Sequence, residues 1–269
     1  MPELPEVETT LRGVAPYLEG CRILGIEVRE ARLRWPIPAA VQQAVGHRVE
    51  FVRRRAKYMI FGLRHGALLL HLGMSGSLRV VTDGTPPLKH DHFDLETERG
   101  ILRFNDPRRF GSLLWSGLPV ERHPLLAALG PEPLGEDFDA EWLWRGARGR
   151  RLAVKNYIMD SRVVTGVGNI YASEALFMAG IHPNRPAGRI SLRRYAGLVE
   201  AIRDVLDRSI AQGGTTLRDY VNSNGMPGYF AQDLLVYERA GKPCFQCGAP
   251  VRQRVIGQRS SYYCVNCQR

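Results

Sequence analysis

The first residues of the chain, Met1-Pro2-Glu3-Leu4-Pro5-Glu6, place a proline directly behind the initiator methionine. Methionine is normally trimmed when the next residue is small, so we expect the mature chain to begin with the secondary amine of Pro2. An α-amino group has a pKa near ~8, and modest desolvation or a nearby cation leaves it neutral and nucleophilic at pH 7. Such an amine can attack an aldehyde carbon and form an iminium beside the Glu3 carboxylate. The alternative is that Pro2 only begins a helix.

Four of the five cysteines form two knuckles near the end of the chain, Cys244-x2-Cys247 and Cys264-x2-Cys267. This spacing is typical of a zinc ribbon, in which four thiolates surround a tetrahedral Zn2+. Because four thiolates close the coordination shell, the predicted single Zn2+ is structural. A pair of disulfides is the alternative, which the absence of an export signal disfavours. Two strands, expected at 251–256 and 261–263, would present Arg259 from a metal-fixed hairpin.

Two further segments carry the residue types needed to distort a DNA duplex. Asp106–Gly111 is predicted to be a tight turn tipped with two guanidinium groups, one of them from Arg108, and the ring of Phe110. His71–Gly76 supplies Met74. Apolar side chains such as Met and Phe can enter a base stack, while Arg reads a base edge. Taken singly, each apolar residue is more typical of a core, so only the combination favours DNA.

Gly166–Ala172 is a glycine-rich segment between two predicted helices, and Lys155 lies one helix upstream. Glycines let a backbone approach a ligand closely, Asn169 is predicted to cap the following helix, and helix N-termini attract phosphate. Two interpretations of this segment remain open at this point: a phosphate-binding site and an ordinary interhelical turn.

The elements that position these residues fall into two groups. Apolar residues at helical spacing predict a helix over 5–18, with Pro5 in its first turn. Short strand-like segments then predict a sandwich or barrel. These segments are 21–29, 48–54, 58–63, 67–72, 77–82, 91–96, 101–104 and 111–115. Turn residues cluster at 130–135 and mark a domain boundary. The helices expected beyond it are 139–146, 151–160, 170–180, 191–211 and a short piece near 215–221.

The composition points to a polyanionic partner. The formal net charge is +10. Only four of the 37 basic residues are lysines, Lys57 among them, and a lysine can lose its proton far more readily than an arginine. No apolar stretch is long enough to span a membrane, and the acidic N-terminus does not resemble a signal peptide. We therefore expect a cytoplasmic protein.

Taken together, these segments resemble the bacterial formamidopyrimidine-DNA glycosylases, a family of repair enzymes for oxidised purines. The resemblance spans essentially the whole chain in one order. It runs through Pro2–Glu8, Arg54–Tyr58, His71–Leu78, Lys89–His92, Asp106–Gly111, Gly166–Ala172, Gln212–Leu217, Pro227–Gln232 and the four-cysteine tail. It implies an α+β multidomain fold: a β-sandwich catalytic domain with flanking helices at 1–131, a helix-two-turn-helix DNA-binding domain at 132–234 and a zinc finger at 235–269.

The resemblance also implies the role of each matching residue. Pro2 would attack C1′ of the damaged nucleotide, and Glu3 would be the acid/base partner at the sugar. Lys57 would donate the proton in β-elimination and Arg259 would act in δ-elimination. Three residues would fill the gap left by the flipped base, with Arg108 reading the orphaned cytosine: Met74, Arg108 and Phe110. Four residues would hold phosphates: His90, Arg150, Lys155 and Asn169.

The implied partner is double-stranded DNA that contains 8-oxoguanine or a formamidopyrimidine, bound by a monomer associated with the nucleoid. Two alternatives remain. An endonuclease VIII-type glycosylase would prefer oxidised pyrimidines. A noncatalytic zinc-ribbon DNA-binding protein would explain the charge and the cysteines, but it leaves Pro2-Glu3 and Lys57 without a role.

Overall fold

The structure, a computed structural model, describes residues 2–214 and 233–269, which form two compact units. The first unit comprises 2–128 and 210–214 of these residues, and the second comprises 129–209 and 233–269. The helix predicted near 215–221 lies outside the described residues. None of the described helices is long and apolar enough to cross a bilayer.

The chain begins with the helix α1, Leu4–Leu18, which confirms the predicted helix over 5–18. Pro5 fits its first turn because the amide hydrogen that proline lacks would have no partner there. Residues at helical spacing, among them Val7, Leu11 and Val14, turn one face of α1 into the core. This face contacts β2 and β3 as well as β5 and β7, so α1 packs against both sheets of the first unit.

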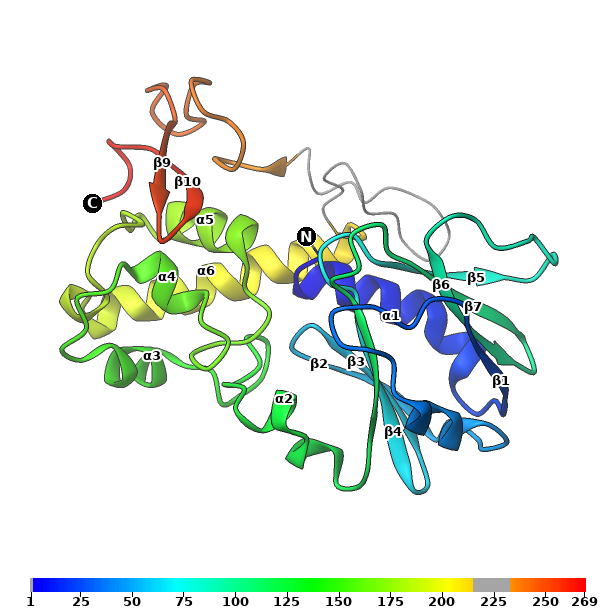
Figure 1. The fold of residues 1–269 in the computed structure, drawn as a ribbon. Helices are drawn as coiled ribbons and strands as arrows, with labels where there is room; N and C mark the ends of the chain where they lie inside the picture. Colours follow the sequence, from blue (N-terminus) through cyan, green and yellow to red (C-terminus); the bar gives the residue numbers. More distant parts are fainter. Residues whose placement is uncertain (1, 215–232) are drawn as a thin grey trace. The chain divides into compact units, whose positions relative to one another are not determined.

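The first unit contains two antiparallel four-stranded sheets packed face to face (Figure 1). This arrangement confirms the predicted β-rich region and shows that it is a sandwich and not a barrel. One sheet has the order β1-β6-β7-β5. Its strands are Ile23–Val28, Asp91–Thr97, Gly100–Asn105 and Ser77–Val81. The other has the order β2-β3-β4-β8. Its strands are Phe51–Arg55, Tyr58–Leu63, Gly66–His71 and Ser112–Ser116. Side chains from both sheets, such as Leu70 and Phe104, form one buried cluster between them. The described part of this unit also contains three short helices: the 3-10 helices η1 (Ala39–Ala44) and η2 (Val120–Arg122), and α2 (Pro124–Ala127).

Two connections in the first unit cross from one sheet to the other and lie side by side. The first leads from β4 to β5 and the second from β7 to β8. His71 at the end of β4 pairs with Ser112 at the start of β8, and Ser77 at the start of β5 pairs with Asn105 at the end of β7. This register brings residues 72–76 and 106–111 together at one end of the sandwich.

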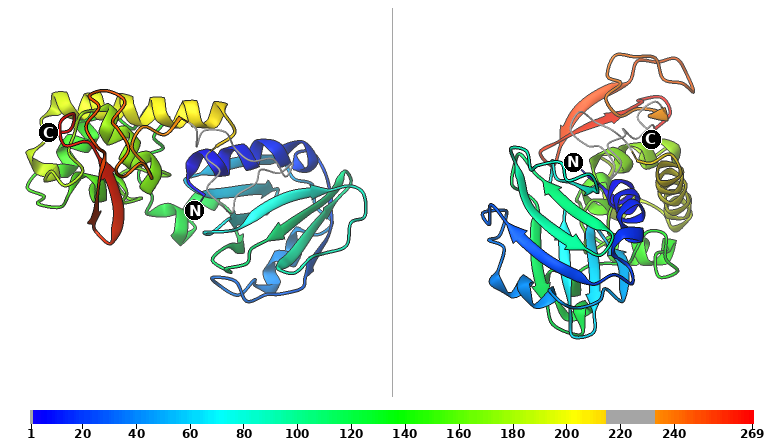
Figure 2. Two further views of the ribbon diagram at one scale, coloured as in Figure 1. Left: turned by 90° about the horizontal axis from the view of Figure 1, so that it is seen from above. Right: turned by 90° about the vertical axis from the view of Figure 1, so that its right-hand side faces the viewer.

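The second unit is helical and carries a C-terminal hairpin, as predicted (Figure 2). Its helices are α3 (Ala140–Ala147), α4 (Val154–Ile158), α5 (Asn169–Met178), the 3-10 helix η3 (Ala187–Arg189) and α6 (Leu192–Ala211). Its hairpin pairs β9 (Arg252–Ile256) with β10 (Arg259–Tyr263). The predicted helix over 151–160 is too long at its start. Its first residues are held in a loop, because the carbonyls of Arg150 and Leu152 accept hydrogen bonds from the backbone at 187–188.

A buried carboxylate on α5 fastens the segment that leads into the hairpin. Glu174 accepts hydrogen bonds from the backbone N–H groups of Leu235, Val236 and Tyr237 at 2.7–2.9 Å. Burial raises the pKa of Glu174, although these three donors act in the opposite direction. The segment that leads into the hairpin is therefore packed against α5 within the second unit.

A buried ion pair between Asp94 on β6 and Arg103 on β7 makes the first unit sensitive to acid. Arg103 Nη2 lies 2.7 Å from Asp94 Oδ2, and the two side chains are 4% and 8% exposed. Burial raises the pKa of Asp94, but hydrogen bonds from Arg103 and Arg29 outweigh it and hold this pKa below its ordinary value. The pair therefore stabilises the fold at neutral pH, and its contribution is lost as the pH falls below about 4 toward the folded-state pKa.

We expect Asp94→Asn to lower the free energy of unfolding by about 3 kcal/mol at pH 7, because the charge of Arg103 stays buried without its counter-ion. The difference from the unchanged protein should shrink as the pH is lowered from about 6 to about 3. Urea unfolding of both proteins measures it. Asp204→Asn removes an exposed pair with Arg208 and is the matched control, expected to cost less than ~0.5 kcal/mol. Equal urea midpoints for Asp94→Asn and the unchanged protein at pH 7 would contradict this account.

Candidate active site and metal centre

The N-terminus is held by a reciprocal pair of hydrogen bonds at the start of α1. Glu6 Oε2 accepts a hydrogen bond from the backbone N–H of Glu3 at 2.8 Å, and the Glu3 side chain accepts one from the backbone N–H of Glu6. Pro2, Glu3 and Glu6 are all buried. The contact fixes the direction in which the chain leaves Pro2. Glu6 was not predicted as a site residue, although an acceptor followed by Glu three residues later is the signal of a capping box.

Lys57 lies in the two-residue turn that joins β2 to β3. Arg55 and Tyr58 pair across the hairpin, and Ala56 adopts a left-handed backbone conformation with φ of 54°. Left-handed backbone costs an alanine about 1–2 kcal/mol, so surrounding contacts must hold the turn in place.

One such contact comes from α1. Arg54 Nη1 donates to the carbonyl of Ala56 at 2.9 Å, while Arg54 Nε donates to Glu8 Oε2 at 2.9 Å. The helix that begins beside Pro2 and Glu3 is therefore tied to the turn that carries Lys57. Neither Glu8 nor Arg54 was predicted to serve the site, because the contact joins residues 46 positions apart.

His71, at the end of β4, is a neutral hydrogen-bond acceptor at physiological pH. Burial, together with the charges of Lys57 and Arg34, lowers the pKa of His71 to about 4. Its Nδ1 accepts a hydrogen bond from the backbone N–H of Gly73 at 2.8 Å, and its ring packs on Tyr58 with centroids 4.8 Å apart. His71 is therefore neutral and adds no second positive charge near Lys57.

The three residues predicted to enter the base stack are carried by the two neighbouring connections. Phe110 is 44% exposed, Arg108 is exposed and Met74 is half-buried. The Arg108 guanidinium lies over the Phe110 ring at 5.4 Å. The backbones touch at Gly73, where a Cβ atom would lie 2.4 Å from the nitrogen of Gly111. Only glycine fits at that position, which also has a left-handed φ of 69°.

The four predicted phosphate contacts fall in different units. His90 lies in the first unit, just before β6, with a left-handed φ of 73°. The other three, Arg150, Lys155 and Asn169, lie in the second unit. Arg150 is exposed in the loop after α3, with its guanidinium 5.4 Å from the Tyr157 ring centroid.

Lys155 and Asn169 both reach the strand that begins with Arg259. The Lys155 ammonium is fully buried and donates to the Ser260 carbonyl at 3.0 Å and to Ser261 Oγ at 2.7 Å. The Asn169 amide also donates to the Ser260 carbonyl, at 3.0 Å. Contrary to the prediction, Asn169 does not cap the helix: its amide nitrogen binds β10, and its side-chain oxygen accepts no hydrogen bond from the helix. Gly168 is the N-cap of α5, and Asn169 is the first helical residue. Arg259 itself is exposed.

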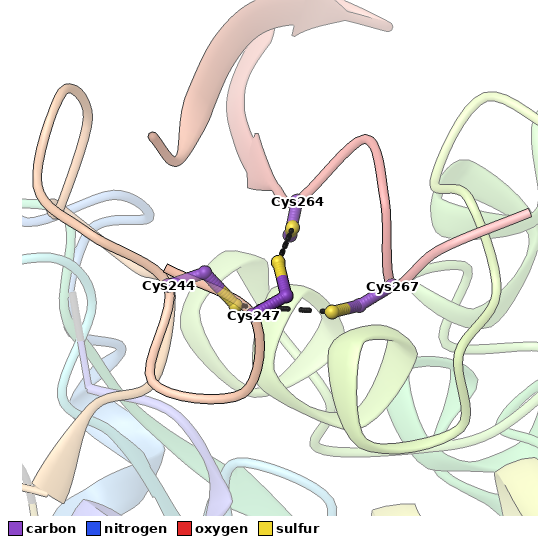
Figure 3. A group of neighbouring side chains, drawn as sticks. All are labelled: Cys244, Cys247, Cys264 and Cys267. Carbon is purple, nitrogen blue, oxygen red and sulfur yellow. Dashed lines mark hydrogen bonds between the residues drawn. The ribbon is translucent and has the colours of Figure 1, made fainter. Parts of the chain in front are cut away.

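The four knuckle cysteines gather around one point, with two sulfurs from the segment before β9 and two from the segment after β10 (Figure 3). All five cysteines lie in the described residues and are free thiols. The Sγ atoms of Cys244 and Cys267 are 3.9 Å apart, those of Cys247 and Cys264 are 3.4 Å apart, and all four lie within 4.8 Å of one another. A tetrahedral ion with Zn–S bonds of ~2.3 Å needs sulfurs about 3.8 Å apart. The cluster therefore fits a four-coordinate metal ion.

Comparison with known proteins connects this arrangement to one family. Residues 1–113 match the formamidopyrimidine-DNA glycosylase N-terminal domain, and residues 129–221 match the formamidopyrimidine-DNA glycosylase H2TH domain. The chain is 63% identical to the formamidopyrimidine-DNA glycosylase of Methylococcus capsulatus and 57% identical to that of Syntrophotalea carbinolica, with 100% of each chain covered.

Solved structures show the same relationship. The MutM (Fpg) protein of Thermus thermophilus has a TM-score of 0.89 at 40% identity, covering 99% of this chain and 98% of its own. A Lactococcus lactis Fpg bound to DNA that contains an abasic site has a TM-score of 0.91 at 31% identity, covering 99% of both chains. These matches confirm the predicted fold class, with its sandwich, its helix-two-turn-helix region and a cysteine cluster consistent with a zinc finger.

Proposed function

Because the chain belongs to the formamidopyrimidine-DNA glycosylase family, we propose that it excises oxidised purines from duplex DNA in base-excision repair and then cleaves the abasic site as a lyase. The observation that carries the proposal is the arrangement at the start of α1. There Pro2 stands beside Glu3, and Glu6 fixes the peptide between them. Solved relatives bound to damaged DNA support DNA as the partner. We propose that the protein acts as a monomer.

The first step is to bring the damaged base out of the stack, because the glycosidic bond cannot be reached inside a duplex. Flipping costs a few kcal/mol. The exposed ring of Phe110 and the half-buried Met74 offset part of this cost by occupying the vacancy. Arg108, whose guanidinium lies beside that ring, supplies the donors that recognise the orphaned cytosine.

The second step is attack on the sugar. The neutral amine of Pro2 forms a bond to C1′ as the bond between C1′ and the base breaks, and the departing base takes up a proton. Glu3 moves the proton that opens the sugar ring, and the product is an iminium between Pro2 and C1′. This covalent intermediate requires a free N-terminal amine.

The last steps are two eliminations. The iminium acidifies the C2′ proton, so loss of that proton breaks the C3′–O bond with the 3′ phosphate as leaving group. Lys57, in its strained turn tied to α1, is the proton donor of this β-elimination. Arg259, exposed at the start of β10, acts in the δ-elimination that breaks the C5′–O bond. One amine thus serves glycosylase and lyase chemistry without an organic cofactor.

The phosphate contacts proposed for DNA binding are His90, Arg150 and Asn169. Lys155 is enclosed, and we propose that it supports the DNA contacts of the second unit by holding Ser260 and Ser261 of β10. We further propose that the four knuckle cysteines bind one Zn2+. Four thiolates leave no open coordination position, so the ion would hold the finger together and take no part in the chemistry.

Excision from matched duplexes tests the proposed function. We expect removal of 8-oxoguanine opposite cytosine to be faster than removal of thymine glycol from the same sequence context. The reverse order would support an endonuclease VIII-type enzyme. Binding without excision of either base would support a noncatalytic DNA-binding protein.

A further inference from the structure

We propose that Asp106 is a positioning residue that locks the two base-stack loops into one rigid unit, so that Met74, Arg108 and Phe110 enter the duplex together. We call residues 72–76 the Met74 loop and residues 106–111 the Arg108 loop. The inference rests on the proposed function, because it concerns how these three side chains act on DNA.

The Asp106 carboxylate joins the two loops directly. Asp106 is completely buried. Its Oδ1 accepts a hydrogen bond from Ser75 Oγ in the Met74 loop at 2.6 Å, and its Oδ2 accepts one from the backbone N–H of Gly111 at 2.7 Å. The backbone N–H of Arg108 lies 3.2 Å from Ser75 Oγ and 3.3 Å from Asp106 Oδ1. Both ends of the Arg108 loop and the middle of the Met74 loop therefore share one carboxylate.

The backbone of Asp106 adds a third attachment. Its N–H donates to the carbonyl of His90 at 3.0 Å, and its own carbonyl accepts a hydrogen bond from His92 Nε2 at 2.6 Å. His92 is buried on β6. The residue that joins the two loops is thus also anchored to the strand that follows His90, one of the proposed phosphate contacts.

The chemistry of this carboxylate differs from that of its neighbours. Asp91 and Asp94 are paired with arginines inside the same sheet, whereas Asp106 has no ion pair within the described residues. Its buried charge is satisfied by hydroxyl and amide donors from the loops. A buried carboxylate is costly unless such donors are held in place, so the charge and the loop conformation stabilise each other.

Rigid coupling matters because filling the vacancy of a flipped base must compete with restacking. Loops that are ordered before binding lose less conformational entropy when they enter the duplex. A preformed abasic site has no base to flip, so its cleavage depends less on the coupled loops. The predicted signature of Asp106 is therefore a selective loss at intact lesions.

The test compares Ser75→Ala with Ser112→Ala. Ser75→Ala removes the hydroxyl that connects the Met74 loop to Asp106 and leaves Met74, Arg108 and Phe110 unchanged. Ser112→Ala is the matched control, because the Ser112 hydroxyl is also buried beside Gly111 but has no hydrogen-bond partner within the described residues. Each variant is assayed in the full-length chain under single-turnover conditions. The substrates are an 8-oxoguanine duplex and the same duplex with a preformed abasic site, and 2-aminopurine next to the lesion reports unstacking.

We expect Ser75→Ala to lower the rate of 8-oxoguanine excision and the rate of the 2-aminopurine fluorescence change about tenfold. The rate of abasic-site cleavage should stay within about threefold of that of the unchanged protein. Ser112→Ala should match the unchanged protein in both assays. Asp106→Asn, which cannot accept from both loops, should show the same selectivity with a larger loss. Normal unstacking and excision by Ser75→Ala, or an equal loss on both substrates, would overturn the inference. Failure of the unchanged protein to excise 8-oxoguanine would instead contradict the proposed function.

Discussion

Glu3→Gln is expected to lower the rate of 8-oxoguanine excision by roughly 10²- to 10⁴-fold, because an amide cannot exchange the proton at the sugar. The substitution keeps the local fold. The Gln side-chain oxygen can still accept the hydrogen bond from the backbone N–H of Glu6 that closes the capping box. The loss should therefore lie in the chemical step, with the DNA affinity changed by less than about threefold.

Single-turnover excision and equilibrium DNA binding together measure this separation. Glu19→Gln is the matched control, because Glu19 is an exposed carboxylate at the other end of the same helix. It should leave both quantities unchanged. Excision by Glu3→Gln within about tenfold of the unchanged protein would remove Glu3 from the proposed proton transfers.

Removal of the metal is the second change with a large expected effect. The cluster that closes the finger contains Cys244, Cys264 and Val251 and packs on Phe177 of α5. Zinc contributes about 10–16 kcal/mol of apparent binding free energy to small fingers, and this energy holds the finger folded. We therefore expect Cys264→Ser, or treatment with a strong chelator, to unfold β9 and β10 and to weaken DNA binding by at least about 100-fold, because Arg259 loses its support.

Metal content and DNA affinity check this expectation in the same samples. The unchanged protein should hold one zinc ion per chain. Cys21→Ala, which removes the buried cysteine of the first unit, is the control and should retain both the ion and the affinity. Full DNA affinity in a metal-free Cys264→Ser protein would contradict the structural role of the ion.

The local elements of this fold could be predicted from the sequence, because their signals are local. Helix α1 follows from the spacing of Val7, Leu11 and Val14, and the strand Tyr58–Leu63 was predicted with its bounds unchanged. The strand pattern by itself could not decide between a sandwich and a barrel, and only the family resemblance indicated the sandwich. The choice depends on which strands pair, such as His71 with Ser112, and this register joins residues distant in the chain.

Apart from Glu6, whose capping contact with Glu3 is local, the parts of the site that escaped prediction depend on contacts across the sequence. The predicted cap at Asn169 was wrong because Asn169 is the first helical residue, after the N-cap Gly168, and its amide nitrogen binds Ser260, 91 residues away. The start of α4 was misplaced because the carbonyls of Arg150 and Leu152 accept hydrogen bonds from the backbone of η3. The role inferred for Asp106 depends on Ser75, 31 residues earlier. Residue types thus identified what could do chemistry, while the tertiary fold decided which residues hold those groups in place.

Borohydride trapping on an 8-oxoguanine duplex tests the central claim most directly. Reduction of the iminium fixes the protein to the DNA, and peptide mass analysis identifies the attached residue. A chain that begins at Pro2 should give a covalent complex with the DNA attached to Pro2, whereas a chain that retains Met1 should give none. Attachment at Lys57, or equal trapping by the chain that retains Met1, would contradict the account.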